Sequence, residues 1–324
     1  MTTTVLQVND LSVSFPGAAG PVVPVDGVSL FLEQGKTLAL VGESGCGKSL
    51  TALSLLRLLP RGAVLAADSS IKLQGLEVTS MNEARLRRLR GAEMAMVFQD
   101  PMTSLNPVYT AGSQITEAIR AHLRVSASEA RDRALALLEE VGIADPRDGL
   151  DRYPHELSGG MRQRIMIAMA LACDPRVLIA DEPTTALDVT VQAQILEILD
   201  RLRETHDMAV LLITHDLGIV AGRADRVAVM YAGRIVELAT TAQLFDRPTH
   251  PYTRALLDSV PRLTGPLERL EPIGGTVPSP ATWPPGCRFH PRCPRAFEPC
   301  AGRSPVLESR GEGHMVACWL EDSG

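Results

Sequence analysis

Eight residues near the start of the chain, GESGCGKS at 42–49, have the composition of a loop that binds phosphate groups. They fit the pattern G-x-x-x-x-G-K-[ST], in which glycines let the backbone turn its N–H groups inward and the following helix points its positive end at the phosphates. Lys48 would reach the β- and γ-phosphates of a nucleotide, and Ser49 would bind magnesium. The loop residues expected at the nucleotide are Gly42, Ser44, Gly45, Cys46, Gly47, Lys48 and Ser49. Cys46 is interpreted as a small filler residue with no redox role.

A second motif, VLIADEP at 177–183, ends a short apolar run with two carboxylates. A buried strand would deliver Asp181 to the carboxyl edge of a sheet, beside the phosphate loop, where it could hold magnesium through water. Glu182 follows directly, so its carboxylate could polarise a water molecule that attacks the γ-phosphate. Acidic pairs are common at strand ends, so this pair alone is a weak indication of a nucleotide site. Together with the phosphate loop it becomes a strong one.

A third motif, LSGGMRQR at 157–164, begins a predicted helix with Ser158, Gly159 and Gly160. A helix N-terminus is itself a site for anions. Because the chain already has a complete phosphate loop, the economical interpretation is that this helix serves the nucleotide of another subunit. A plain helix cap is the alternative interpretation.

The elements around these motifs predict an α/β fold. Residues 6–15 and 25–35 alternate apolar and polar side chains, which is typical of antiparallel strands with one solvated face. The apolar runs at 37–42, 177–181 and 209–216 indicate strands buried on both faces of a mainly parallel sheet.

Other patterns predict single helices and turns. A helix-rich segment is expected at about 105–170, and within it Ser126 and Glu129 form a possible capping box for a helix that stops at Gly142. Residues 226–238 indicate a hairpin with its turn near Ala232 and Gly233. The basic run at 85–90 is interpreted as a solvated helix face.

Composition excludes some classes of protein. The 324 residues are 45% hydrophobic and 22% charged, with a net charge of −6, which gives no support to a nucleic-acid-coating role. The first residues do not resemble a signal peptide, and no apolar run approaches the roughly 20 residues that span a bilayer. We therefore expect a soluble, cytoplasmic chain whose membrane involvement comes through a partner.

The end of the chain is rich in proline after about residue 260 and contains four of the six cysteines, Cys287, Cys293, Cys300 and Cys318. Disulfides are not expected in a reducing compartment, so the clustered thiols suggest a metal. The usual C-x2–4-C start of a zinc site and the spacing of bacterial ferredoxins are both absent, so the spacing does not identify the metal. His290 and His314 are either spare ligands or exposed residues.

The five segments GESGCGKS, VFQDP, LSGGMRQR, VLIADEPTTALD and LLITHD resemble, in order and spacing, the motifs of ATP-binding-cassette (ABC) ATPase subunits. The resemblance covers about residues 5–260. It implies a P-loop NTPase cassette with a mainly parallel central sheet, an antiparallel β subdomain and a helical insertion at about 105–170. It also implies ATP and Mg²⁺ as ligands. Residues 1–260 would form the cassette and 261–324 a small Cys-rich extension.

The same resemblance implies roles for individual residues. Gln99 resembles the glutamine that senses magnesium and couples to membrane subunits, and His215 resembles the switch histidine that contacts the γ-phosphate. Ser158, Gly159 and Gly160 resemble the signature that closes on the opposite subunit's ATP, and Asp188 the loop that crosses between subunits. Phe15 lies where an aromatic ring stacks on adenine; a core strand residue is its alternative interpretation. Because each motif occurs once, a second subunit is required.

The segment RPTHPYTRALLDSVP at 247–261 on its own predicts a surface loop and an amphipathic helix that buries Leu256 and Leu257. The sequence of this segment, with His250, Pro251 and Tyr252, resembles the carboxyl-terminal extension of ATPases that serve oligopeptide, dipeptide and nickel importers. No catalytic role is assigned to these three residues. The four-cysteine tail resembles one associated with a 4Fe–4S cluster, and zinc or free thiols are the alternatives.

This resemblance predicts the ATPase subunit of a di- or oligopeptide importer, bound peripherally to the cytoplasmic face of the inner membrane. Its expected partners are a homologous second ATPase subunit, two permease subunits and an extracytoplasmic solute-binding protein, without nucleic acid. Nickel or another small solute is the alternative cargo. A cassette ATPase outside transport is a more distant alternative.

Overall fold

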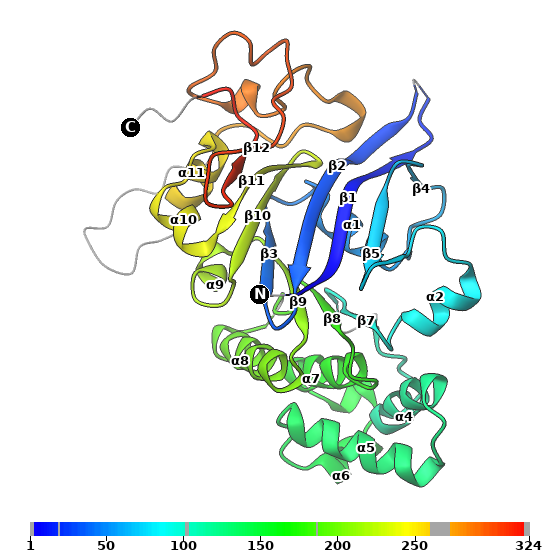
Figure 1. Cartoon of the computed structure of the whole chain (residues 1–324). Coiled ribbons are helices and arrows are strands. Elements are labelled where there is room, and N and C mark those ends of the chain that lie inside the picture. Colours follow the sequence, from blue (N-terminus) through cyan, green and yellow to red (C-terminus); the bar gives the residue numbers. More distant parts are fainter. Residues whose placement is uncertain (1–2, 19, 101–103, 186, 260–272, 321–324) are drawn as a thin grey trace. The chain divides into compact units, whose positions relative to one another are not determined.

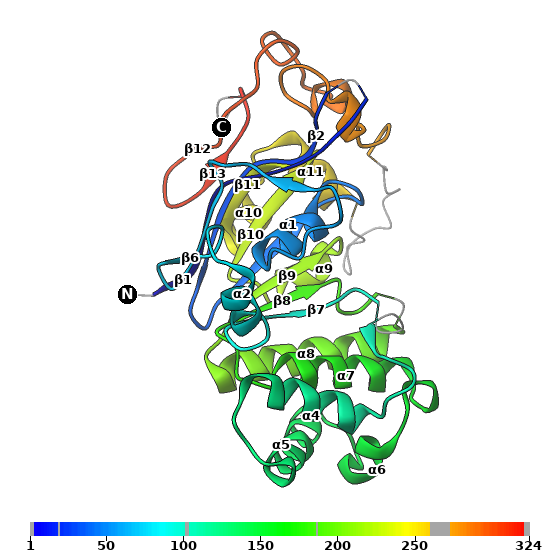
Figure 2. The ribbon, with the colours of Figure 1, turned by 90° about the vertical axis from the view of Figure 1, so that its right-hand side faces the viewer.

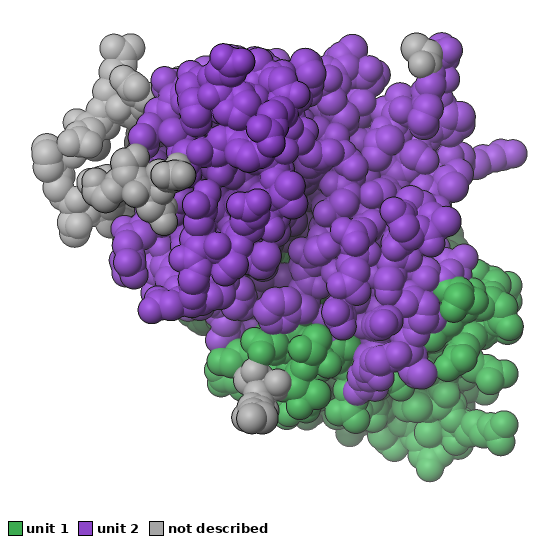
Figure 3. Space-filling view, turned by 45° about the horizontal axis from the view of Figure 1, so that its top comes forward, with its two compact units in different colours: residues 1–5, 32–36, 80–212 green, residues 6–31, 37–79, 213–324 purple. Residues whose placement is uncertain are grey.

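The computed structural model describes residues 3–18, 20–100, 104–185, 187–259 and 273–320. The chain forms two compact units, coloured separately in Figure 3. Unit 1 contains residues 1–5, 32–36 and 80–212, and unit 2 contains residues 6–31, 37–79 and 213–324. The predicted boundary between cassette and extension, at 260–261, lies outside the described residues, as does the last residue of the VFQDP segment.

Unit 2 contains the strand that leads to the phosphate loop. Strand β3 (Thr37–Val41) is buried at every residue and pairs in parallel with β10 (Arg226–Tyr231), which confirms the prediction of a doubly buried parallel strand. Strands β10 and β11 (Arg234–Thr240) form an antiparallel hairpin, as predicted. Its turn residues Ala232 and Gly233 both have positive φ angles, 46° and 85°, which is typical of a type I′ hairpin turn.

A second sheet in unit 2 is the predicted antiparallel one. Strand β1 (Thr4–Phe15) neighbours β2 (Val22–Glu33) and pairs antiparallel with β4 (Val64–Leu65) and β5 (Ser70–Leu73). Strand β5 continues antiparallel to β6 (Leu76–Glu77). Buried and more exposed residues alternate along β1, so one face of the sheet packs on the core and the other is solvated.

Unit 1 holds the other predicted buried strands. Strand β7 (Met94–Val97) pairs in parallel with β8 (Val177–Asp181), and β8 neighbours β9 (Ala209–Thr214), whose last two residues belong to unit 2. All residues of β8 and β9 are buried. Helix α8 (Val189–His206) packs against α7 (Gly159–Ala170) in the same unit.

The predicted helix-rich segment contains α4 (Ala111–His122), α5 (Ala127–Glu140), α6 (Pro146–Asp151) and α7. Figure 1 shows these helices packed together in green within unit 1. The capping box of α5 is present, because Ser126 accepts the Glu129 N–H and the Glu129 carboxylate accepts the Ser126 N–H. The helix ends at Glu140 with Val141 as its C-cap, and Gly142 follows with φ of 77°, as predicted.

The remaining helices are short. In unit 1, α2 (Glu83–Leu89) buries Leu86 and Leu89 and exposes its arginines, which confirms the solvated basic face. In unit 2 the helices are α1 (Lys48–Leu55), α9 (Leu217–Ala221), α10 (Thr241–Asp246) and α11 (Pro251–Asp258). No helix among the described residues is long and apolar enough to cross a membrane.

The C-terminal segment, residues 273–320, is part of unit 2 and has little regular structure of its own. It contains the short strands β12 (Glu308–Ser309) and β13 (Met315–Val316), and β13 pairs antiparallel with β11. Figure 2 shows this segment, in orange and red, beside β11 and β2. Phe289 is its main apolar anchor: it is 1% exposed and packs edge-on against Tyr231 of β10.

Candidate functional site

The phosphate loop connects β3 to α1 and makes very close backbone contacts. A Cβ atom on Gly42 would lie 2.2 Å from the Met230 carbonyl oxygen, and one on Gly47, where φ is 109°, would lie 2.8 Å from the Pro24 carbonyl oxygen. Both positions therefore require glycine. The loop thus combines a strand end, closely packed glycines and a helix start, which is the architecture of a phosphate cradle.

Lys48 lies across this loop. Its side-chain Nζ donates to the carbonyl oxygens of Gly42 at 2.7 Å and Glu43 at 3.0 Å, and the residue is 5% exposed. The loop carbonyls thus hold the ammonium group among the backbone atoms that would surround the phosphates. Cys46 is buried beside it, and burial raises the pKa of its thiol, so the thiol stays protonated at neutral pH.

In unit 1, the structure brings Gln99 and Glu182 into direct contact. The Glu182 carboxylate accepts hydrogen bonds from Gln99 Nε2 at 2.9 Å and Thr185 Oγ1 at 3.0 Å. Asp181 precedes it at the end of β8 and is 4% exposed. Glu182 has a φ of 46°, an uncommon conformation for a residue with a side chain, and such strain is often found at functional sites.

The helix starts in LSGGMRQR and ALD also lie together in unit 1. Ser158 is the N-cap of α7 and its Oγ accepts the Met161 N–H at 3.3 Å, which is compatible with both interpretations of this motif. Asp188 is the N-cap of α8 and accepts the Val191 N–H at 2.9 Å. A Cβ on Gly160 would lie 2.7 Å from Val191, so glycine lets the two helix starts approach each other. A role for Ser158 at another subunit's nucleotide stays a prediction.

The predicted site residues are divided between the two units. The phosphate loop, Phe15 and His215 lie in unit 2, whereas Gln99, Asp181, Glu182 and the signature residues lie in unit 1. Phe15 is the half-buried last residue of β1, and His215 is an exposed residue that follows β9. Their contacts with adenine and γ-phosphate stay predictions.

Two protein families match the chain. The ABC transporter family matches residues 25–185, and the C-terminal region of oligopeptide/dipeptide transporters matches residues 236–300. The chain is 50% identical to the oligopeptide transport ATP-binding protein AppD of Bacillus subtilis, over 99% of this chain and 98% of the relative. It is 48% identical to the dipeptide transport ATP-binding protein DppD of Escherichia coli, over 98% of both chains.

The chain belongs to the ABC transporter ATPases. Its fold agrees with this membership. The dimeric ATP-binding cassette MJ0796 bound to ADP and Pi covers 73% of this ABC ATPase at 24% identity, with a TM-score of 0.65. The cassette cbiO1 from Clostridium perfringens covers 75% at 25% identity, with a TM-score of 0.64. These structures confirm the predicted P-loop NTPase cassette, and membership of the family confirms the ATP-hydrolysing activity.

A loop at 247–249 with partly exposed residues leads into α11, as predicted, but the His-Pro-Tyr segment that follows is buried, which was not predicted. His250 and Tyr252 are 1% and 0% exposed, because Tyr252 packs against Tyr231 and Phe289. Helix α11 forms as predicted, with Leu256 and Leu257 partly buried. Sequence patterns missed this burial because Tyr231 and Phe289 are distant along the chain.

Glu237 of β11 organises the surroundings of this segment. It is 0% exposed and accepts the Thr249 and His250 N–H groups at 2.8 and 2.9 Å, and His314 Nε2 lies 2.8 Å from its carboxylate. His314 is thus neither exposed nor a spare metal ligand as proposed from the sequence, because it pairs with Glu237. Burial opposes ionisation of Glu237, but hydrogen bonds led by that from His314 outweigh it and lower the pKa of its carboxyl group.

We predict that Glu237→Gln destabilises the protein by about 1–3 kcal/mol at neutral pH, since the buried N–H donors lose a charged acceptor. The lowered pKa of Glu237 also determines how stability changes with pH. Its contribution to stability is present above the unfolded pKa of about 4.3 and is lost as pH falls through the folded value. Chemical denaturation from pH 7 to pH 3 measures this. Glu308→Gln, an exposed change on β12, is the control. Equal stability and equal acid sensitivity of the two variants would contradict the prediction.

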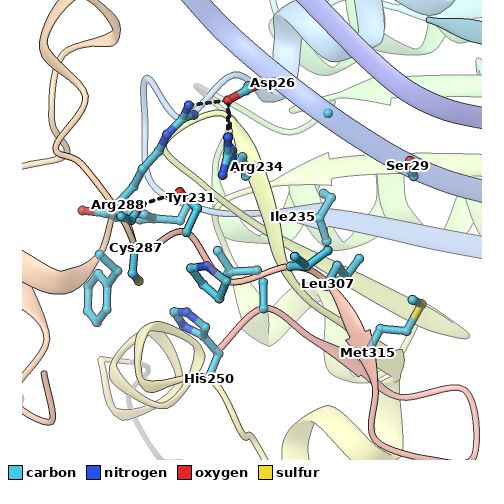
Figure 4. Close-up of a pocket in the computed structure, with 18 of the residues that line it drawn as sticks. Asp26, Ser29, Tyr231, Arg234, Ile235, His250, Cys287, Arg288, Leu307 and Met315 are labelled. Carbon is cyan, nitrogen blue, oxygen red and sulfur yellow. Dashed lines mark hydrogen bonds and ion pairs between the residues drawn. The ribbon is translucent and has the colours of Figure 1, made fainter. Parts of the chain in front are cut away.

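An arginine joins the C-terminal segment to the rest of unit 2. Arg288 lies in an ion pair with Asp26 of β2, which also pairs with Arg234 at 2.8 Å. These residues line a pocket of about 450 Å³ shared by β2, the β10–β11 hairpin and the C-terminal segment. Figure 4 shows Asp26 between the two arginines, with Cys287 and His250 farther along the wall.

The four C-terminal cysteines are free thiols. Burial, with added repulsion from Cys318, Cys300 and Cys293, raises the pKa of Cys287 to about 11, so this thiol is protonated at neutral pH. His290 Nδ1 lies 2.8 Å from the Cys287 carbonyl oxygen. Among the residues that the structure describes, no group of three or more His, Cys, Asp and Glu side chains is arranged to hold a metal ion. Thiols are ligands that soft metals prefer. In this structure, however, the described cysteines are not arranged as a metal centre.

Proposed function

We propose that this ABC ATPase powers the import of dipeptides or oligopeptides. The observation that carries the proposal is the match at residues 236–300 to the C-terminal region of oligopeptide/dipeptide transporters. It is supported by relatives of nearly equal length whose names refer to oligopeptide and dipeptide transport. These relatives favour peptides over nickel as cargo, and they disfavour a role outside transport.

The proposed partners are a second, homologous ATPase subunit, two permeases and an extracytoplasmic solute-binding protein. The chain would bind peripherally to the cytoplasmic face of the inner membrane through the permeases. The test is ATP hydrolysis by the transporter reconstituted with its binding protein. We expect dipeptides or oligopeptides to stimulate hydrolysis and Ni²⁺ to have no effect. Stimulation by Ni²⁺ alone would contradict the proposed cargo.

For the nucleotide, we propose that the loop Gly42–Ser49 binds the triphosphate through its N–H groups and Lys48, while Phe15 stacks on adenine. Ser49, Gln99 and Asp181 would hold Mg²⁺, which neutralises phosphate charge when bound. Glu182 would polarise the attacking water, which requires Gln99 to release the carboxylate that it contacts in this structure. His215 would contact the γ-phosphate.

The second half of each nucleotide site is proposed to come from the partner ATPase. Ser158, Gly159 and Gly160 at the start of α7 would face the γ-phosphate held by the partner's phosphate loop, where a helix N-terminus stabilises negative charge. Asp188 would lie in the loop that crosses between the subunits. ATP would close the dimer and hydrolysis would open it, because only different affinities for the two states can drive movement in the permeases.

We also propose that Cys287, Cys293, Cys300 and Cys318 hold a structural 4Fe–4S cluster, with zinc as the alternative. The support is the chemistry of the donors: four thiols lie in one segment with little regular structure, and such segments commonly need a cross-link. The thiols would have to come together for this, because in this structure they are not arranged as a metal centre. Iron, sulfide and zinc analysis of anaerobically purified protein tests this. Roughly four iron atoms per chain are expected. One zinc atom per chain would support the alternative. The absence of both iron and zinc would refute both assignments.

A further inference from the structure

Glu43, the second residue of the phosphate loop, is held by the C-terminal part of the chain. Its backbone N–H donates to the Tyr252 hydroxyl at 2.9 Å, and its carboxylate accepts Arg292 Nη1 at 2.8 Å and Nη2 at 3.0 Å. Its carbonyl oxygen accepts Lys48 Nζ at 3.0 Å. Glu43 therefore joins the phosphate-binding lysine to two residues that lie more than two hundred positions later in the sequence.

Arg292 is positioned for this contact. Its side chain is 5% exposed, and Nε donates to the Gly274 carbonyl oxygen at 2.7 Å while the guanidinium lies over the Tyr231 ring. A planar guanidinium that binds a carboxylate through two nitrogens has a fixed orientation. The contact therefore has a fixed geometry, unlike exposed ion pairs such as Arg152–Asp148 at the end of α6.

The charge of Glu43 gives this contact a consequence for nucleotide binding. A carboxylate at the start of a phosphate loop would repel a triphosphate, and the repulsion is strong where water is partly excluded. Arg292 neutralises that carboxylate and directs it toward the C-terminal segment. Tyr252 fixes the backbone of the same residue, and with it the carbonyl oxygen that binds Lys48.

A second line of contacts reaches the middle of the loop. Arg288 donates to the Ala232 carbonyl oxygen at 2.5 Å, in the hairpin turn between β10 and β11. The neighbouring Gly233 N–H donates to the Cys46 carbonyl oxygen at 2.9 Å. The C-terminal segment thus supports the phosphate loop at Glu43 directly and at Cys46 through the hairpin.

We propose that Arg292 and Tyr252 are positioning residues for the phosphate loop, so that the affinity of this subunit for ATP depends on its C-terminal segment. Neither residue belongs to the loop; both contact Glu43 and act through it. The inference rests on the proposal that residues 42–49 bind the triphosphate.

The test is titration of the full-length chain, purified anaerobically, with a fluorescent ATP analogue and Mg²⁺. Arg292→Ala is expected to weaken binding about tenfold, because Glu43 keeps an unpaired charge. Tyr252→Phe is expected to weaken it about threefold. The double variant Glu43→Gln/Arg292→Ala should bind within about threefold of Glu43→Gln alone, since the repelling charge is gone. A merely structural role of Arg292 would not produce this recovery.

Arg303→Ala is the matched control, because Arg303 belongs to the same segment and its guanidinium lies over the Trp319 ring. Binding by Arg292→Ala equal to that of Arg303→Ala would overturn the inference, as would a double variant as weak as Arg292→Ala. If Arg292→Ala does not fold, Arg292→Lys carries the same comparison, with an expected loss of about threefold that Glu43→Gln removes. Lys48→Ala separates the two proposals: its normal binding would refute the phosphate loop as the nucleotide site, independently of Arg292.

Discussion

Replacement of Glu182 by Gln is expected to lower ATP turnover by about 10²- to 10⁴-fold while ATP binding stays within about threefold of wild type. The amide keeps the shape of the side chain and can still bond to Gln99 and Thr185, but it cannot take a proton from water. Closure of the ATP-bound dimer should persist, because it requires the triphosphate and not its hydrolysis. Turnover by the assembled transporter and binding of the ATP analogue measure the two effects separately.

Glu204→Gln provides a matched control for this change. Glu204 lies on α8 in the same unit, and its side chain is 72% exposed. We expect its turnover to equal that of wild type. If Glu182→Gln retained normal turnover, Glu182 would not be the base, and the uncommon backbone conformation at this position would need another explanation.

The Lys48→Ala change is expected to weaken ATP binding by about 10- to 150-fold, the effect of losing charged hydrogen bonds to the phosphates. Turnover should fall as well, because the lysine also stabilises charge on the γ-phosphate during transfer. Lys72→Ala, at an exposed position on β5, removes the same charge from the same unit and should change neither quantity. Binding of ATP by Lys48→Ala with wild-type affinity would contradict the assignment of the loop.

The sequence predicted those parts of the fold that short-range patterns determine. The buried strands β3, β8 and β9, the capping box of α5 and the turn at Ala232 and Gly233 all follow from residues close together in the chain. The phosphate loop was recognisable for the same reason, since its glycines, lysine and serine lie within eight residues.

The contacts that depend on distant residues could not be predicted. Arg292 appears in the sequence as one more arginine beside a cysteine, yet it binds Glu43 at the other end of the chain. His314 suggested a metal ligand because it lies near cysteines in sequence, whereas in the fold it pairs with Glu237 across the β11–β13 ladder. Hydrophobic periodicity carries no information about such long-range polar pairs.

The central claim is that each triphosphate is bound between the phosphate loop of one ATPase subunit and the start of the other subunit's helix that corresponds to α7. Its most direct test is the ATP turnover of the assembled transporter in which only Ser158→Arg is introduced into this chain. The account predicts a loss of about 10²-fold or more, while the free chain binds the ATP analogue as wild type does, because its own phosphate loop is intact. Wild-type turnover by the Ser158→Arg transporter would contradict the account.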